Sequence, residues 1–565
     1  MLVSPYNPPA NCHPYDIQTI GNYRILRASI DRVLAYNSLE AFERLLSDYP
    51  DFDLRMTVGE KRPLLHTVIR HCDVEFVQIL LRHGGCFSEV FDAVDEDGQT
   101  SLTLACQLKK SSIVKVLCDA GANVNTAEHV QASTPLICAV QQGDIETVRL
   151  LCDAGANREL TDRDHCSAMT YAIYLDNVSI VTLLHEKGAT ADGDNVLGHS
   201  LCMAAAKGHV RTLEALLSLG GSAHINMRAK VTGAPPLFFA AMSTNAPDVV
   251  DMLRKRGASL SAVDYRGYTA LMVAAEMDNV SMIRALLMLH DKDIDAKSYD
   301  KFYGTMHKDE ESYRKAVSQL NVLTPERGVL LYGETALMIA ARRGNHRAVY
   351  ALLGAQPTTD ARNHRCYTAL MLASETGTPQ VISALCGHGA STSLTNDKGW
   401  PPLAIAISRG RVDNVEALIA HKANVDQYID NNNGTPLMLA ARLGHAGLIS
   451  ILHRAGANIA MRDRDGNDAL LAAVLSGSLP AVQALLSVGA AVDAPNTAGF
   501  SPLMAAAQCN HVEALRLLIQ AGADFSRKTD QGWTAKTYAI HATATRAVEF
   551  LEGCEQAEVA VKAMR

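Results

Sequence analysis

Aromatic side chains are scarce in this 565-residue chain: they make up 5% of it, and only two are tryptophans. Positive charge is not in excess either, because 52 Lys and Arg stand against 60 Asp and Glu, a net charge of −8. This balance excludes a broadly basic surface, so no nucleic-acid partner is expected. Apolar runs stay well short of the ~18–20 residues that a spanning helix needs, so no membrane span is expected.

Cysteine pairs of the C-x-x-C type are also missing, although the chain has 13 cysteines. Most of them lie inside apolar runs, and the N-terminal sequence lacks the basic start and apolar stretch of a secretory signal. Reduced, buried thiols in an intracellular protein explain this pattern best. We therefore expect a cytoplasmic protein, with the nucleus left open as a second compartment.

Catalytic signatures are absent from the sequence. It contains no G-x-x-x-x-G-K-[ST] phosphate loop, no H-E-x-x-H, no G-x-S-x-G and no kinase H-R-D or D-F-G motif. Residues 463–466 look like part of a calcium loop, but Met461 stands where an oxygen ligand is needed, so a turn is expected. We expect no enzyme activity, no catalytic, cofactor-binding or metal-binding residue, no cofactor and no small-molecule substrate.

A period of about 33 residues, a length typical of repeat proteins, runs through nearly the whole chain. The segment GYTALMVAAE from Gly267 recurs as GETALMIAAR from Gly333 and as GTPLMLAAR from Gly434. The residue after the motif leucine recurs at a nearly constant spacing, except that the spacing doubles between Met272 and Met338. We interpret that doubled interval as two periods, with a degenerate unit kept in register between them. Together with a divergent unit at residues 31–51, this predicts about sixteen units.

Each unit is expected to hold two helices. An Ala-rich first helix begins after a hydroxyl residue that can cap its free amides, and a second helix ends at Leu-Leu followed by Gly-Ala. An Asp-x-x-Gly turn leads into the next unit. The capping residue is threonine at positions 100, 134, 269, 335, 368 and 435.

This pattern resembles the ankyrin repeat over about residues 23–552. The resemblance implies an all-α fold, an α-solenoid of about sixteen ankyrin repeats, each a helix-turn-helix with a β-hairpin or loop, in a curved superhelical stack. Among the repeat motifs only His66 keeps the histidine of the family's T-P-L-H tetrapeptide, and five units have methionine there. Since that histidine ordinarily bonds between repeats, we expect apolar packing to replace those bonds.

The predicted organisation has five parts. Residues 1–22 form an extended N-terminal arm, and residues 23–295 form a first sub-stack of repeats. Residues 296–332 carry a charged helix and loop in a degenerate repeat, and a hinge and a merely decayed repeat are equally favoured there. Residues 333–552 form a second sub-stack that ends in a C-terminal cap, because terminal repeats need a polar outer face. Residues 553–565 form a C-terminal tail.

Two rows of side chains are candidates for binding other proteins. The first row stands just before the capping residue and contains large aromatic residues, which dominate binding hot spots: Tyr268, Tyr367, Trp400, Phe500 and Trp533. The second row lies at the end of the first helices and is cationic: Arg342, Arg343, Arg409 and Arg442. Stiffening of the stack by the rings, and solvated arginines without a ligand, are the competing interpretations.

The resemblance implies a non-catalytic scaffold or adaptor that binds partner proteins on its concave face. The cationic row suggests a partner with an acidic or phosphorylated segment. The alternative is a targeting or substrate-recognition subunit of an enzyme complex, such as a ubiquitin ligase or a protein kinase. Asn125 is placed like asparagines that are hydroxylated in ankyrin proteins, although a turn cap explains it more simply.

Overall fold

The computed structural model describes residues 28–49, 57–58, 62–83, 91–189, 196–220, 224–229, 232–243, 245–287, 333–429 and 432–564. The predicted arm, residues 1–22, and the predicted degenerate repeat, residues 296–332, lie outside them. Contacts divide the chain into two compact units: unit 1 comprises residues 1–231 and 235–258, and unit 2 comprises residues 232–234 and 259–565. This division does not coincide with the predicted boundary at residue 295.

Unit 1 alternates first and second helices along the chain. After the helical residues 28–36 come the second helix α2 (Leu39–Asp48) and a short antiparallel pair of strands, β1 (Thr57–Val58) and β2 (Arg62–Pro63). The first helices that follow are α3 (Leu64–His71), α6 (Ser101–Gln107), α8 (Pro135–Gln141), α10 (Ala168–Tyr174), α12 (Val196–Lys207) and α14 (Pro236–Phe239), which continues as the 3-10 turn η2 (Ala240–Met242). Their second helices are α4 (Val74–His83), α7 (Ser111–Asp119), α9 (Ile145–Asp153), α11 (Val178–Glu186), α13 (Val210–Ser218) and α15 (Ala246–Lys255).

Unit 2 repeats the same alternation. Its first helices are α16 (Ala270–Glu276), α20 (Ala336–Arg343), α22 (Ala369–Thr376), α24 (Pro402–Ser408), α26 (Pro436–Arg442), α28 (Ala469–Ser476), α30 (Pro502–Gln508) and α32 (Ala535–His541). Its second helices are α17 (Val280–Leu286), α21 (His346–Leu353), α23 (Pro379–Gly387), α25 (Val412–Ala420), α27 (Ala446–Arg454), α29 (Leu479–Ser487), α31 (Val512–Gln520) and α33 (Thr545–Met564). Because α33 runs unbroken to Met564, residues 553–564 continue the last repeat and do not form a separate tail.

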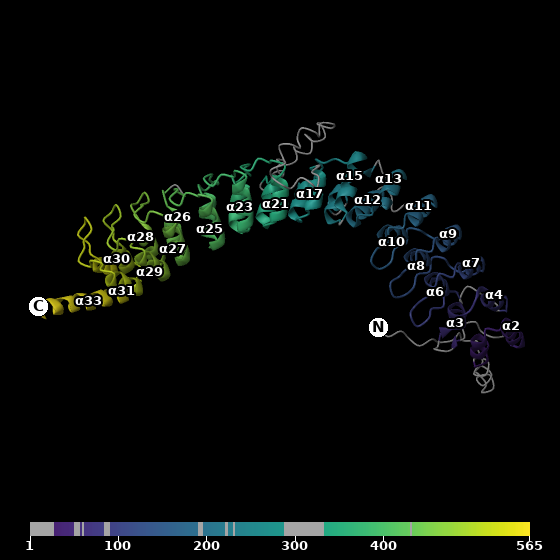
Figure 1. Cartoon of the computed structure of the whole chain (residues 1–565). Helices are drawn as coiled ribbons and strands as arrows, with labels where there is room; N and C mark the ends of the chain where they lie inside the picture. The colour runs from purple at the N-terminus through teal and green to yellow at the C-terminus, as the bar shows by residue number, and fades with distance from the viewer. Residues whose placement is uncertain are drawn as a thin grey trace. The chain divides into compact units, whose positions relative to one another are not determined.

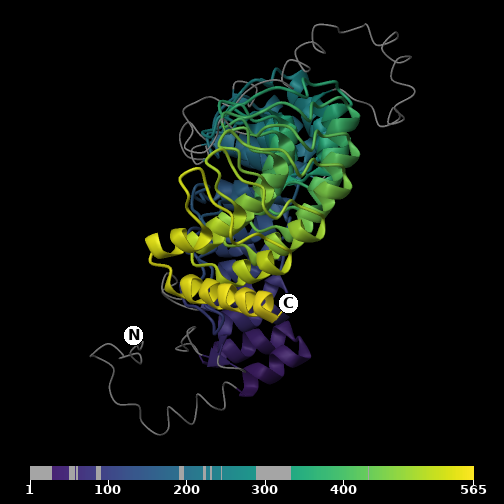
Figure 2. The same ribbon diagram turned by 90° about the vertical axis from the view of Figure 1, so that its left-hand side faces the viewer.

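Within each unit the helices form two layers. First helices pack on first helices, as α20 does on α22, and second helices pack on second helices, as α21 does on α23. Figure 1 and Figure 2 show consecutive pairs following one another, with the loops of the C-terminal repeats projecting from the helices. The alanine pairs of the first helices are fully buried, at positions 274–275, 340–341, 440–441 and 505–506. Small side chains therefore set the close approach between neighbouring first helices, and the predicted all-α repeat solenoid is confirmed.

The predicted caps are present at both ends of the helices. The hydroxyl oxygen of each motif threonine accepts a hydrogen bond from the backbone N–H three residues on, as Thr368 does from Met371 at 3.3 Å. Ser167, Asp468, Ser501 and Thr534 do the same in their repeats. The glycines of the Gly-Ala segments that end the second helices have a left-handed backbone conformation, as Gly121 does with a φ of 88°. Residues 463–466 form a turn as expected, in which the Asp463 carboxylate accepts bonds from the backbone of Asp465 and Asn467.

Methionine occupies the histidine position of the family tetrapeptide in five repeats. His66 bonds through Nε2 to the Gln99 carbonyl of the next repeat at 2.8 Å. In three repeats the methionine sulfur instead accepts a hydrogen bond from the backbone N–H of its own capping residue, at 3.4–3.5 Å: Thr269 to Met272, Thr335 to Met338 and Ser501 to Met504. These sulfur contacts close the cap within one repeat, and the five methionines are buried, as expected if apolar packing replaces the bond of the histidine to the next repeat.

The doubled interval between Met272 and Met338 does not correspond to an intervening helix pair in the stack. Helix α16 packs directly on α20, and α17 packs directly on α21. The Asn345 side chain donates hydrogen bonds to the carbonyls of Ala275 and Glu276, both at 2.9 Å. These two pairs are consecutive neighbours, so the prediction of a unit kept in register between them is wrong.

The described cysteines are all free thiols. Five of them are buried, at positions 72, 106, 138, 152 and 202, whereas Cys509 is exposed and the others are half-buried. The prediction of reduced thiols is consistent with this, but burial is less general than the apolar runs suggested.

Candidate functional site

The first-helix face of unit 2 carries both predicted rows. We define this face as the last turns of the first helices from α16 to α32 together with the residues just before their caps. Stacking of the first helices brings equivalent positions of consecutive repeats next to one another. The aromatic row is interrupted by Glu334, Gly434 and Asn467, which hold the same position in the intervening repeats.

Tyr268 does not lie on the surface as predicted. Its side chain is only 3% exposed, and the guanidinium carbon of Arg266 lies 4.3 Å from the centre of its ring. Burial is the main cause that raises the pKa of its phenol above the ordinary value. The ring and its cation form a pair internal to the repeat, so Tyr268 supports the competing interpretation of a ring that stiffens the stack.

Tyr367 and Trp400 are half-buried, and equivalent loops hold them. Their backbone N–H groups donate to the side-chain oxygens of Asn363 and Asn396, at 2.8 and 2.9 Å. The guanidinium of Arg365 stands over the Tyr367 ring at 5.5 Å. Each ring therefore has a fixed backbone and a part-exposed side chain.

Phe500 and Trp533 belong to an aromatic cluster at the C-terminal end of the face. Tyr538, on α32, meets the Phe500 ring edge-on at 4.9 Å and lies 5.1 Å from the Trp533 ring. His541, one turn further along α32, lies 5.1 Å from Trp533. Tyr538 and His541 were not predicted as site residues. Their positions, one and two helical turns after the Thr534 cap, are the signal that places them on one side of α32.

The cationic row is interleaved with carboxylates. Nη2 of Arg343 lies 2.5 Å from Oε1 of Glu276 in the preceding repeat. The Arg409 guanidinium forms the equivalent ion pair with the Glu375 carboxylate of its own preceding repeat. The row is thus a ladder of alternating charge, whereas the sequence predicted a cationic row. The arginine side chains of these two pairs are 56% and 57% exposed, so a partner anion can reach them, whereas Glu276 and Glu375 are only 16% and 25% exposed.

The two ends of this ladder differ. Nη2 of Arg342 lies 2.7 Å from Oε2 of Glu334, whose side chain is only 1% exposed. Burial raises the pKa of the Glu334 carboxyl, although the nearby arginines act in the opposite direction. Arg442 is exposed, and no carboxylate among the described residues lies within ion-pair distance of it. Of the four predicted arginines, Arg442 is the one presented without a described ion-pair partner.

Asn125 lies in unit 1 and acts as a structural link. Its side-chain oxygen accepts a hydrogen bond from the backbone N–H of Asn157 in the next repeat at 2.7 Å. The same bond recurs in unit 2, where Asp426 accepts from the backbone of Asn458 at 2.9 Å. This recurrence supports the simpler interpretation of Asn125 as a cap of the turn.

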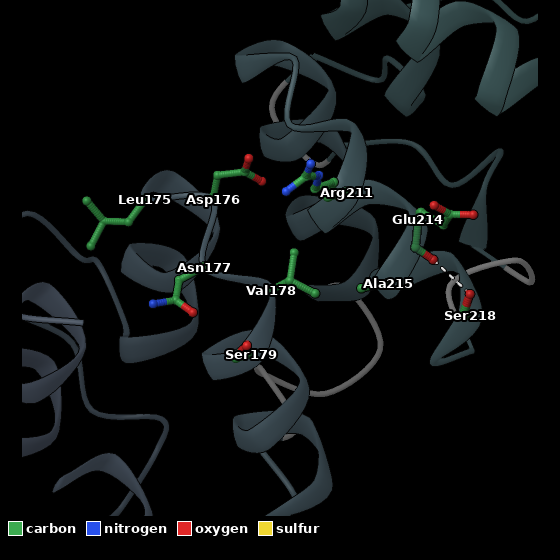
Figure 3. A pocket seen from close by; sticks show the side chains of 9 residues that line it. All are labelled: Leu175, Asp176, Asn177, Val178, Ser179, Arg211, Glu214, Ala215 and Ser218. Atoms are coloured by element: carbon green, nitrogen blue, oxygen red, sulfur yellow. Dashed lines mark hydrogen bonds between the residues drawn. The ribbon is translucent and has the colours of Figure 1, made fainter. Parts of the chain in front are cut away.

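A cavity of about 680 Å³ opens in unit 1 and was not predicted from the sequence. Figure 3 shows the side chains that line it, which come from residues 175–179 and from α13. Its acidic groups already have partners: Asp176 accepts from the Thr212 hydroxyl at 2.7 Å, and Glu214 lies 3.9 Å from Arg256. His209 Nδ1 also lies 3.8 Å from the Asp176 carboxylate, so both acidic groups of the lining have a polar or charged neighbour.

The described residues contain neither a candidate metal site nor a candidate membrane-spanning helix. No group of three or more His, Cys, Asp or Glu side chains there is arranged to hold a metal ion. None of the helices described combines the length and the apolar character that crossing a bilayer requires.

The repeat geometry agrees with the comparisons. The family model for ankyrin repeats (three copies) matches residues 31–128, 126–195, 201–298, 313–396, 337–429, 370–463, 425–496 and 470–563. The chain belongs to the ankyrin-repeat family. Ankyrin repeats are typically non-catalytic modules of protein–protein interaction, and this establishes the general class of surface that unit 2 presents.

One relative carries a name that refers to an enzyme. The ankyrin chain is 28% identical over 204 residues to a protein of Danio rerio named "Putative palmitoyltransferase ZDHHC13". The match covers 36% of this chain and 32% of that protein, so this chain spans about a third of the length of the relative. Since ankyrin repeats occupy most of this chain, the likeness concerns its repeats.

Proposed function

We propose that the protein is a scaffold or adaptor that binds partner proteins on the first-helix face of unit 2. The observation that carries the proposal is the presence of both rows on that face. Tyr367 and Trp400 are half-buried rings with fixed backbones in the same stack in which α20, α24 and α26 end in exposed arginines. Rigid aromatic rings next to guanidinium groups are the composition of binding hot spots.

The partner segment that fits the arginine row is acidic or phosphorylated. A carboxylate or phosphate would bind Arg442 directly and would compete with Glu276 and Glu375 for Arg343 and Arg409, whose side chains are 56% and 57% exposed. Charge-assisted bonds from guanidinium to a carboxylate or phosphate are stronger than neutral hydrogen bonds. Binding of this kind needs no catalysis, so we propose a non-enzymatic role in the cytoplasm.

Charge reversal at Arg442 tests the proposal. In affinity purification of the full chain followed by mass spectrometry, Arg442→Glu should remove bound partners, whereas Arg454→Glu should retain them. Arg454 is the matched control, because it is an exposed arginine of the same repeat but lies on the second helix α27. Equal recovery of partners with both variants would refute binding through the arginine row. The combination Trp400→Ala with Arg343→Ala extends the test to the aromatic row, and far-UV circular dichroism checks that this form is folded.

The second candidate is a targeting or substrate-recognition subunit of an enzyme complex, such as a ubiquitin ligase or a protein kinase. What favours it is the relative whose name refers to a transferase and whose match lies in repeats like these. Stoichiometry separates the two candidates. One enzyme recovered at a 1:1 ratio with the chain would favour the targeting subunit, and several substoichiometric partners would favour the scaffold.

A further inference from the structure

The rings before the first helices of unit 2 differ in the residue two positions earlier. It is basic before Tyr268, Tyr367 and Trp400 and uncharged before Phe500 and Trp533, although Lys398 and Trp400 form no cation–π pair among the described residues. In the loops that precede α16 and α22, the residue two positions before the ring is an arginine. Arg266 lies over Tyr268 at 4.3 Å, and Arg365 lies over Tyr367 at 5.5 Å. In these repeats the chain supplies its own cation to the ring.

The last two repeats lack that cation. The residues two positions before Phe500 and Trp533 are Ala498 and Gln531, and both are exposed. Among the described residues, none of the cation–π pairs involves Phe500, Trp533 or Tyr538. The three rings are arranged edge-on and tilted, each is half-buried, and the imidazole of His541 lies 5.1 Å from the Trp533 ring.

The charges around the cluster are mixed, but the helix ends beside it carry no arginine. The first helices that form the face near the cluster, α28 and α30, end in Ser476 and Gln508 and carry no arginine there, unlike α20 and α26. Asp530 is exposed in the loop before Trp533, and no ion pair of its carboxylate is found among the described residues. Basic residues lie nearby in the sequence as well: Arg527 and Lys528 precede Trp533, and Lys536 on α32 is paired with Glu552 and Glu555 at 3.3 and 2.9 Å.

We propose that the cluster of Phe500, Trp533 and Tyr538 binds an arginine or lysine side chain of a partner, which takes the place that Arg266 and Arg365 occupy in the earlier repeats. The proposal rests on the proposed function and adds a second specificity to it. The α20–α26 part of the face selects an anionic segment, and the C-terminal cluster selects a cationic one. A partner segment with acidic and basic stretches in the right order would match both.

The two tryptophans of the chain allow a direct test. Full-length protein labelled with 5-fluorotryptophan gives two ¹⁹F signals, which Trp400→Phe assigns. The probes are a capped Gly-Ser-Arg-Arg-Ser-Gly peptide and its twin with citrulline, which keeps the shape of arginine but has no charge. The arginine peptide should shift the Trp533 signal, and the citrulline peptide should bind about fivefold more weakly, as expected for the loss of one part-exposed cation–π contact.

Filling the site from within gives the control variants. Gln531→Arg and Ala498→Arg restore an internal cation at exposed positions, so they should abolish the response to the arginine peptide without unfolding the chain. Gln531→Leu, which adds no charge, should leave the response unchanged. The proposal is overturned if the citrulline peptide or a proline-rich peptide shifts the Trp533 signal as strongly as the arginine peptide does. It is also overturned if no arginine peptide shifts that signal, or if Gln531→Arg binds as well as the wild type.

These outcomes are distinguishable from failure of the proposed function. Loss of cation selectivity at Trp533 with partners still captured through Arg442 would remove only the inference. A cation-selective Trp533 signal in a protein that captures no partner by affinity purification would remove only the scaffold role.

Discussion

At the level of single side chains, a capping oxygen recurs in most of the described repeats, although Pro63, Pro235 and Pro401 take its place before α3, α14 and α24. Thr368 is fully buried, and its hydroxyl accepts the bond from Met371 that begins α22. Such a cap depends only on residues three apart, so the sequence pattern was sufficient to predict it. Trp400, Trp533 and Tyr268 stand at the same position of the repeat, yet Tyr268 is buried and the others are half-buried. That difference depends on neighbouring repeats, which a local pattern does not contain.

The cap gives the first prediction. Thr368→Ala should destabilise α22 by about 1 kcal/mol, because the Met371 amide loses its partner inside a buried layer. Hydrogen exchange of the α22 amides should become faster by a corresponding factor. Thr368→Ser keeps the oxygen and is the control, with exchange close to the wild type. Equal exchange in the alanine and serine forms would show that the methyl group, not the oxygen, matters at this position.

The thiols give a prediction about pH. Burial raises the pKa of Cys138 and of Cys202 to about 12, so both remain protonated at pH 8, and the thiolate is the reactive form. Among the described cysteines, the exposed Cys509 should therefore react with iodoacetamide at pH 8 before Cys138 and Cys202, which should react only after urea unfolding. Mass spectrometry of digested samples measures the order, and Cys509→Ser should remove the early-labelled peptide that contains this position. Rapid native labelling of Cys138 would contradict its burial.

At the level of helices, the period predicted most of the stack but not where it is interrupted. The spacing between Met272 and Met338 is twice the repeat length, and on its own it predicts an extra stacked pair of helices. The contacts of α16 with α20 show that sequence register and spatial neighbourhood are separate properties. Packing of one pair on the next is a long-range interaction, and a period alone does not establish it.

A deletion tests this arrangement. Residues 287–335 connect α17 to α20, whereas the much shorter segment 354–368 connects α21 to α22. Removing residues 295–328 would leave a connection of the ordinary length. It would not remove Ala275 or Glu276, which accept the hydrogen bonds from Asn345 and the ion pair from Arg343. Hydrogen exchange in α16 and α20 should therefore stay within about sixfold of the wild type, since shortening the connection from 49 to 15 residues changes its closure free energy by about 1 kcal/mol at about 0.6 kcal/mol per doubling.

The matched variant for the deletion is Asn345→Ala. Asn345→Ala should speed hydrogen exchange of the α16 and α20 amides more than the deletion does, because the carbonyls of Ala275 and Glu276 lose their hydrogen-bond donor. For buried groups such a loss costs about 1–3 kcal/mol. If the deletion destabilised α16 and α20 more than Asn345→Ala did, the removed residues would have to contribute to the packing of these two pairs.

At the level of the whole molecule, each unit is a series of helix pairs in which a pair contacts the pair before it and the pair after it. Stability is then close to a sum of repeat terms and nearest-neighbour terms, and no single core connects distant repeats. Such an arrangement distributes binding over separate patches, which is why the arginine ladder and the C-terminal aromatic cluster can have different ligands. The same arrangement makes the effect of a core mutation local.

Leu452 tests that locality. Its side chain on α27 is fully buried, so Leu452→Ala should cost about 2–5 kcal/mol through lost apolar contact and the cavity it leaves. Hydrogen exchange should rise in α25, α27 and α29, which pack on one another, and should not change in α7 and α9 of unit 1. Leu151→Ala, at a fully buried position of α9, is the reciprocal control and should affect α7, α9 and α11 while leaving α27 protected. Loss of protection in both units from either substitution would require a cooperative fold in which distant repeats unfold together, and that would contradict stability built from neighbouring pairs.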